Sequence, residues 1–248
     1  MQKIIGREAV LAALHDPALV VPPVPVAPPG SRGISWLRAT VGRFSTGREH
    51  QRRRALSVAV LDAIPPQSLR AAAAAHPVAI LARAMNVEPP GAYPVRVVGP
   101  VHVVDLVRDV AQAYQPGTGD AALADAAVDR LVQILGDVPD EPTAARIGVL
   151  VQACEATAVL IERARHRPID DVLRDDPPVP ATRRLVLAAT TVCPFHLQPG
   201  ELVQLCLAGD LAFGAGARRC PGQAHALALV EAALACTTSP PCVAPASP

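Results

Sequence analysis

The stretch FGAGARRCPGQ, from Phe213 to Gln223, carries most of the information about fold and chemistry in this chain. Gly214, Gly216 and Gly222 let a loop turn tightly and aim backbone N–H groups at one point. Cys220 lies within this loop, directly before an Ala- and Leu-rich segment that is typical of a helix. A cysteine in that position is stabilised as a thiolate and is suited to bind a metal. The alternative is a glycine-rich turn that holds a buried free cysteine.

The composition bounds what the rest of the chain can be. The chain has 248 residues, enough to bury a core, and half of them are apolar. Charged residues make up 18% and the formal net charge is +1, which argues against a disordered chain and against nucleic acid as a partner. Aromatic residues are only 2%, so Ala, Val and Leu must build the core.

The sequence predicts neither a membrane anchor nor a secretory signal. The apolar run from Ile4 to Val26 is broken by charged residues and prolines, well short of the ~20 clean residues that a membrane span needs. The six cysteines form no C-x-x-C pair, which argues against a zinc ribbon or a dense disulfide framework. We therefore expect a cytoplasmic protein with reduced thiols.

Hydrophobic patterning favours a mostly α fold with a small β element. We expect one domain over residues 1–236 and a disordered tail over residues 237–248. Short β-type runs occur between Val179 and Leu207. Helices are predicted over Arg7 to Leu14, from Gly47 to Ile64, in the alanine run Ala71 to Ala75, and over Val103 to Tyr114, Ala121 to Leu135, Pro142 to Arg165 and Gln223 to Cys236.

The cysteine loop fits the pattern F-G-x-G-x-R-x-C-x-G at all six specified positions. It resembles the loop that holds the haem iron in the cytochrome P-450 superfamily. The resemblance implies a reduced cytochrome P-450-like fold around haem b, with Cys220 as the proximal iron ligand. Phe213 and Gly214 would then belong to the cofactor-binding loop, and Arg218 would pair with a haem propionate.

Two further segments are similar to propionate-binding segments of this family. In GREHQRRRAL, from Gly47 to Leu56, His50 and Arg54 lie four residues apart on one helix face, where both can reach a propionate. Without the resemblance, the arginines of this segment read as a solvated basic face or a weak phosphate patch, an alternative that weighs most for the neighbours Arg52 and Arg53. After the segment IDDVLRDDPPVP, the resemblance assigns the other propionate to Arg183 in preference to Arg184.

The segment LVQACEATAVLI, residues 150–161, resembles the long helix that crosses the haem in this family. Glu155 falls on the acidic position and Thr157 on the second threonine, so the resemblance implies that both relay protons. The first threonine is replaced by Ala156. Read alone, the segment is an amphipathic core helix with one acid. The family's E-x-x-R pair becomes Asp171 and Arg174, for which a buried structural ion pair is expected.

Family members are usually longer, and the differences fall on the segments that form the substrate lid, the meander before the cysteine loop, the first strands and the last hairpin. We expect a more open distal pocket, and a partner protein that covers the reduced lid. The haem loop is better preserved than the residues that activate oxygen.

The sequence therefore favours a haem-thiolate oxidase or monooxygenase that acts on a small organic substrate, with electrons from a ferredoxin-type donor or with peroxide. The alternative is a haem protein without oxidase activity: a sensor, a helper subunit or a redox-neutral catalyst. A third hypothesis, a remnant that no longer binds haem, is disfavoured by the intact cysteine motif.

Overall fold

The computed structural model describes residues 1–71, 76–87 and 102–238. The expected alanine-run helix lies largely outside these residues, as does most of the expected tail. The helices are α1 (Arg7–His15), α2 (Ile34–Thr40), α3 (Gly47–Asp62), α4 (Pro77–Ala84), α5 (Val103–Gln112), α6 (Ala121–Ile134), α7 (Glu141–Ala164), α8 (Ile169–Asp175) and α9 (Gln223–Thr238). The strands are β1 (Gln2–Ile4), β2 (Leu19–Val20), β3 (Ala181–Val186), β4 (Thr190–Val192), β5 (Phe195–Leu197) and β6 (Leu202–Cys206). Four 3-10 turns are η1 (Gly42–Phe44), η2 (Pro66–Ala71), η3 (Gly209–Leu211) and η4 (Gly216–Arg218).

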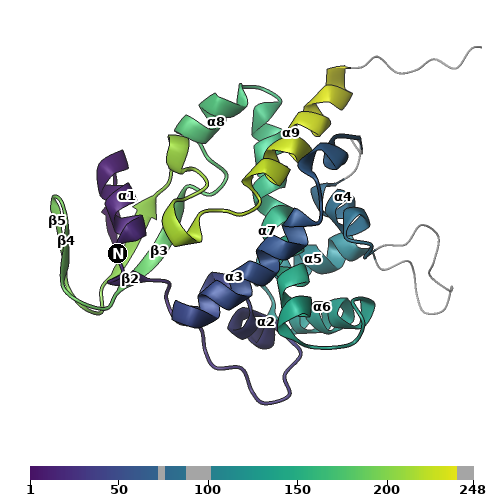
Figure 1. The fold of residues 1–248 in the computed structure, drawn as a ribbon, viewed down its shortest axis with the longest axis horizontal. Helices are drawn as coiled ribbons and strands as arrows, with labels where there is room; N and C mark the ends of the chain where they lie inside the picture. Colours follow the sequence, from purple (N-terminus) through teal and green to yellow (C-terminus); the bar gives the residue numbers. More distant parts are fainter. Residues whose placement is uncertain (72–75, 88–101, 239–248) are drawn as a thin grey trace, which may run out of the picture.

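Helix α7 is the centre of the helical part, with α3, α4, α5 and α9 packed around it (Figure 1). Its first turn is held by Asp140, whose carboxylate accepts a hydrogen bond from the backbone N–H of Thr143. Ile147 and Leu150 are fully buried on it. By length and composition α7 also resembles a membrane-spanning helix, yet 61% of its apolar window is buried inside the protein. It therefore packs here as a core helix.

The strands form a second, smaller region. One sheet has the order β1-β6-β3-β2, in which β1 runs parallel to β6, and β3 is antiparallel to both β6 and β2. A separate hairpin pairs β4 with β5. Helix α1 packs against the sheet, so that Val10, Ala13 and Leu205 share one apolar cluster. Strands β1 and β2, only two or three residues long, were not expected from the sequence.

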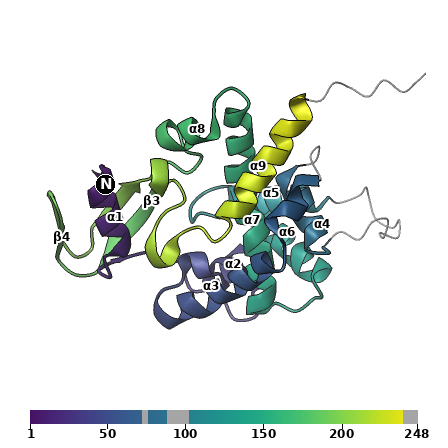
Figure 2. The same ribbon diagram turned by 45° about the horizontal axis from the view of Figure 1, so that its top comes forward.

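The cysteine loop connects the two regions. The chain leaves β6, passes through η3 and η4, and enters α9; Figure 2 shows this segment running between the sheet with α1 on one side and α2 with α3 on the other. His225 fixes the start of α9 because its Nε2 lies 3.1 Å from the carbonyl oxygen of Leu61 and 2.8 Å from that of Ile64, at the end of α3. The loop is therefore anchored to α3 directly after Cys220.

The structure confirms a mostly α fold with a small β element. The helices expected from residues 103, 121 and 142 begin within one residue of α5, α6 and α7. The short helices α2, α4 and α8 were not expected as separate elements, because seven or eight residues hold too few turns for a clear apolar period.

Candidate cofactor site

The loop around Cys220 is closed by its own backbone. The N–H of Cys220 donates to the carbonyl oxygen of Phe213 at 2.8 Å, and the N–H of Gly214 donates to that of Leu211 at 2.8 Å. Gly214 and Gly216 have φ angles of 71° and 64°, in the left-handed region that only glycine enters without cost. Two of the motif's glycines are therefore required by the turn itself.

Cys220 is solvent-accessible at the wall of a hollow of about 390 Å³. Surrounding protein atoms raise the pKa of its thiol, while the backbone of Gly222 and the charges of Arg54, Arg219 and Arg43 act in the opposite direction. The hollow is lined by Arg54, Arg219, Cys220, Pro221, Gln223, Ala224 and Leu227. The net effect is a raised pKa, so burial outweighs the positive charges that would stabilise a thiolate.

Four arginines and one histidine gather beside the loop. We call them the basic cluster: Arg43 on η1, His50 and Arg54 on α3, Arg184 on β3 and Arg218 on η4.

Their hydrogen bonds go to neutral oxygens. Arg218 donates to the carbonyl oxygen of Ser45 and Arg54 to that of Arg219, each at 2.5 Å. Arg184 donates to the hydroxyl of Thr182 and to the carbonyl oxygen of Arg183, each at 2.8 Å. Within the described ranges, no ion pair joins a member of the cluster to Asp or Glu.

Burial and neighbouring positive charges lower the pKa values of two members of the basic cluster. Burial, followed by the charges of Arg218 and Arg54, lowers the pKa of His50 to about 4, so the imidazole is neutral at pH 7. Burial, followed by the charges of Arg218 and Arg43, lowers the pKa of Arg184 to about 10. Arg184 is 4% exposed, so its guanidinium is a buried cation without an acidic partner. Such a cation is costly unless an anion binds beside it.

Strand β3 corrects one predicted residue. Neighbouring residues of a strand point to opposite faces, and here Arg183 is exposed whereas Arg184 is buried in the basic cluster. Arg183, the preferred propionate ligand of the sequence analysis, therefore lies outside the cluster, and Arg184, the alternative, lies within it. The signal available in the sequence was Val186, a core residue two positions after Arg184 and hence on the same face.

Arg43 was missed altogether. It reaches the cluster because Gly42 lets η1 approach α3 closely: a Cβ at residue 42 would lie 3.2 Å from the backbone nitrogen of Arg54. No local pattern in the sequence marks this contact between distant segments.

The opposite face of α3 is organised differently. Arg52 and Arg53 both bind Glu141 at the start of α7, with N–O distances of 2.7 and 2.9 Å. These hydrogen bonds lower the pKa of Glu141 to about 2. The two arginines are thus structural partners of an acid, neither a free basic face nor a phosphate patch.

The structure does not bring Glu155 and Thr157 together. Residues two apart on a helix are separated by about 200°, and Glu155 is exposed whereas Thr157 is 3% exposed. Within the described part of the chain, no hydrogen bond or ion pair links either residue to Cys220 or to the basic cluster. Ala156, between them, is half-buried and carries no hydroxyl.

The pair expected to be buried near the cofactor is instead on the surface. Asp171 and Arg174 do interact, at 2.7 Å, but their side chains are 37% and 61% exposed. The expectation of a buried ion pair was wrong, because α8 presents this pair to solvent, where Arg174 also binds Asp175.

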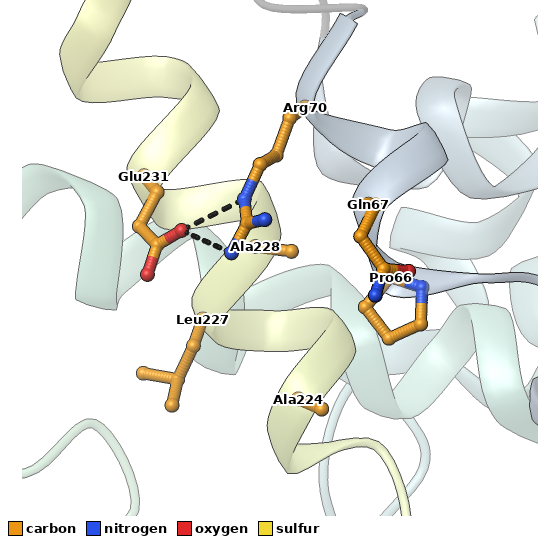
Figure 3. A pocket seen from close by; sticks show the side chains of 7 residues that line it. All are labelled: Pro66, Gln67, Arg70, Ala224, Leu227, Ala228 and Glu231. Carbon is orange, nitrogen blue, oxygen red and sulfur yellow. Dashed lines mark hydrogen bonds and ion pairs between the residues drawn. The ribbon is translucent and has the colours of Figure 1, made fainter.

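A second hollow lies further along α9 (Figure 3). It measures about 290 Å³ and shares Ala224 and Leu227 with the hollow at Cys220. Its cation is neutralised, because Arg70 binds Glu231 at 2.7 Å. Of the two hollows along α9, the one at Cys220 is therefore the one whose arginines have no acidic partner among the described residues.

No protein-family model and no curated protein matches this chain. Solved structures do. P450BioI in complex with an acyl carrier protein ligated to hexadec-9Z-enoic acid matches with a TM-score of 0.65 at 16% identity, over 95% of this chain and 83% of that one. CalO2 matches with a TM-score of 0.60 at 15% identity, over 94% and 81%. Ligand-free CYP164A2 from Mycobacterium smegmatis matches with a TM-score of 0.57 at 15% identity, over 93% and 81%. The chain thus has a cytochrome P450 fold, as the cysteine loop predicted.

Proposed function

We propose that this protein is a haem-thiolate oxidase of the monooxygenase type, with Cys220 as the proximal ligand of haem b. The observation that carries the proposal is the coincidence of Cys220 with the acid-free basic cluster. A haem presents an iron to one sulfur and two carboxylates at its edge. A single cysteine beside several unpaired arginines is the donor set that this group requires.

Different residues of the basic cluster would bind different parts of the haem. Arg54, Arg184 and Arg218 would bind the propionates, and neutral His50 would donate one hydrogen bond. Phe213 and Gly214 would shape the loop around the sulfur. When bound, the haem supplies the oxidising chemistry, and the thiolate donates electron density to the iron.

Proton supply is assigned to α7. Glu155 is exposed, so its carboxylate can exchange protons directly with water. Thr157 points into the core, and a relay in which both residues act on one substrate is not supported by their placement. The substrate we propose is a small organic molecule.

A second function has an observation of its own. Ala156 offers no hydroxyl, and Thr157 lies on the other side of α7. A haem protein that does not activate oxygen, such as a sensor, a helper subunit or a redox-neutral catalyst, needs the cysteine and the cluster but not this hydroxyl. Turnover separates the two functions.

We also propose an electron donor, a partner protein and a cellular location. An acidic ferredoxin-type protein would dock on the surface beside the cysteine loop, where Arg219 is exposed; peroxide would replace this donor. The neighbour P450BioI was solved with a carrier protein bound. By analogy, a partner protein would cover the reduced lid here. We further propose a cytoplasmic location and one haem-binding domain over residues 1–236.

The first experiment is an absorption spectrum of the purified, reduced protein under carbon monoxide. We expect the red-shifted Soret band of thiolate ligation in the wild type. Cys220→Ser should abolish it, whereas Cys193→Ser, an exposed cysteine between β4 and β5, should retain it. An unchanged spectrum in Cys220→Ser overturns the ligand assignment.

The second experiment is turnover with a ferredoxin system or with peroxide. Oxidised product from a panel of small organic compounds supports the oxidase. Haem binding without any product in either system favours the non-oxidising function.

A further inference from the structure

The basic cluster holds more positive charge than a haem can neutralise. Arg43, Arg54, Arg184 and Arg218 contribute four guanidinium groups, and no carboxylate of the described residues pairs with them. Two propionates leave a positive surplus that like-charge repulsion makes unfavourable. A further anion beside the cluster would reduce it.

Arg43 is the member of the cluster that is free for such an anion. It is exposed, whereas Arg54 and Arg218 are half-buried and Arg184 is buried. Each of the other three donates a hydrogen bond to another segment of the site or to its own strand: Arg54 to the carbonyl oxygen of Arg219, Arg218 to that of Ser45, and Arg184 to the hydroxyl of Thr182.

The guanidinium of Arg43 makes cation–π contacts with two aromatic rings. Its central carbon lies 5.8 Å from the ring centroid of Phe44 and 6.0 Å from that of Tyr114, and the two rings pack edge-to-face at 5.2 Å. When the amide of Gln115 is oriented with its oxygen towards Arg43, this oxygen accepts hydrogen bonds from Nη2 at 2.7 Å and from Nε at 3.2 Å. A cation fixed by two rings and an amide loses little freedom when it binds an anion.

The neighbours of Arg43 pack on α7. A Cβ at Gly148 of α7 would lie 3.3 Å from Val41, two residues before Arg43, and 3.9 Å from the hydroxyl of Tyr114, whose ring Arg43 contacts. Arg43 also influences the Cys220 thiol electrostatically.

We infer that Arg43 binds a carboxylate of the substrate, so that the small molecule oxidised or rearranged here is an anion. The inference rests on the proposed function, since the propionates are assumed to occupy the other arginines. Arg43 is a binding residue that sets substrate class and takes no part in holding the haem.

The test compares a carboxylate with a neutral molecule of the same chain length. Hexanoate and hexan-1-ol are titrated into the haem-loaded protein by calorimetry, and the haem content of each variant is measured first. The wild type should bind hexanoate about tenfold more tightly than hexan-1-ol, as expected for one charge-assisted pair. Arg43→Gln should lose this preference, and Arg43→Lys should retain part of it. Arg48→Gln, an exposed arginine at the start of α3, is the matched control and should keep the preference in full.

Each other outcome overturns the inference in a recognisable way. Equal binding of hexanoate and hexan-1-ol by the wild type removes the anion site. Loss of haem from Arg43→Gln assigns Arg43 to the cofactor, which leaves the proposed function intact. A wild type that takes up no haem refutes the proposed function, and the Arg43 dependence of hexanoate binding is then measured on the protein as purified: an unaltered preference in Arg43→Gln refutes the inference as well.

Discussion

The two faces of α3 carry the same residue type in opposite situations. Arg52 and Arg53 face Glu141 and form ion pairs that join α3 to α7. Arg54, the next residue, turns with His50 towards Cys220 and binds only carbonyl oxygen. The two arginines that join α3 to α7 have an acidic partner, and the arginine beside the cysteine loop has none among the described residues. This difference supports the proposed cofactor site more than the number of arginines does.

The largest contrast should appear in cofactor affinity. Arg54→Gln removes a charge-assisted partner of a propionate, worth ~1.5–3 kcal/mol, and should weaken hemin binding by roughly 10- to 100-fold. Arg52→Gln removes a charge whose partner is Glu141 and should leave the hemin affinity unchanged. Titration of the haem-free protein with hemin, followed by absorbance, measures both. Equal losses in the two variants would erase the distinction between the faces.

For the free energy of unfolding we expect the opposite ranking, with the larger loss on the Glu141 side of α3. Glu141→Gln leaves Arg53, whose side chain is 14% exposed, with only its longer 3.6 Å contact to Glu49, and should lower the free energy of unfolding by ~1–3 kcal/mol. Arg54→Gln relieves repulsion with Arg218 and should lower it little or not at all. Urea unfolding without cofactor compares the two. A larger loss in Arg54→Gln would contradict the account.

His50 and the Glu141 partner of the other face should also affect the free energy of unfolding in different pH ranges. The pKa of His50 is lowered from 6.5 to about 4, so the unfolded chain binds a proton first, and stability falls as pH drops from about 6.5 towards 4. The pKa of Glu141 is lowered from 4.5 to about 2, so its contribution is complete above pH 4.5 and is lost as pH falls towards 2. His50→Gln should flatten the upper window, and Glu141→Gln the lower. Urea midpoints measured across pH 2–8 test both, and a variant that flattens the other window refutes the assignment.

The smallest effect is expected at α8. The pair Asp171–Arg174 is exposed, and Arg174→Gln should change the free energy of unfolding by no more than ~0.5 kcal/mol. Thermal unfolding of Arg174→Gln and Glu141→Gln, measured under the same conditions, compares the two losses. A loss as large as that of Glu141→Gln would mean that this pair supports the core after all.

The sequence predicted what is local and missed what depends on distant contacts. The resemblance pointed to His50 and Arg54, and their helical spacing of four places them on one face. The loop of Cys220 was recognised by its motif, whose glycines are fixed by its own turn. Arg184 requires knowing which face of β3 is buried, and Arg43 requires the approach of η1 to α3. Glu155 and Thr157 were paired by resemblance, although their spacing of two places them on different sides of α7.

We propose that the acid-free arginines Arg54, Arg184 and Arg218 bind the carboxylates of a haem. Hemin titration of Arg184→Gln and Arg183→Gln is the sharpest test, because the two residues are neighbours on β3 and differ in the face they occupy. We predict at least a tenfold loss of hemin affinity in Arg184→Gln and wild-type affinity in Arg183→Gln. Equal affinities in the two variants, or no hemin binding by the wild type, would contradict the claim.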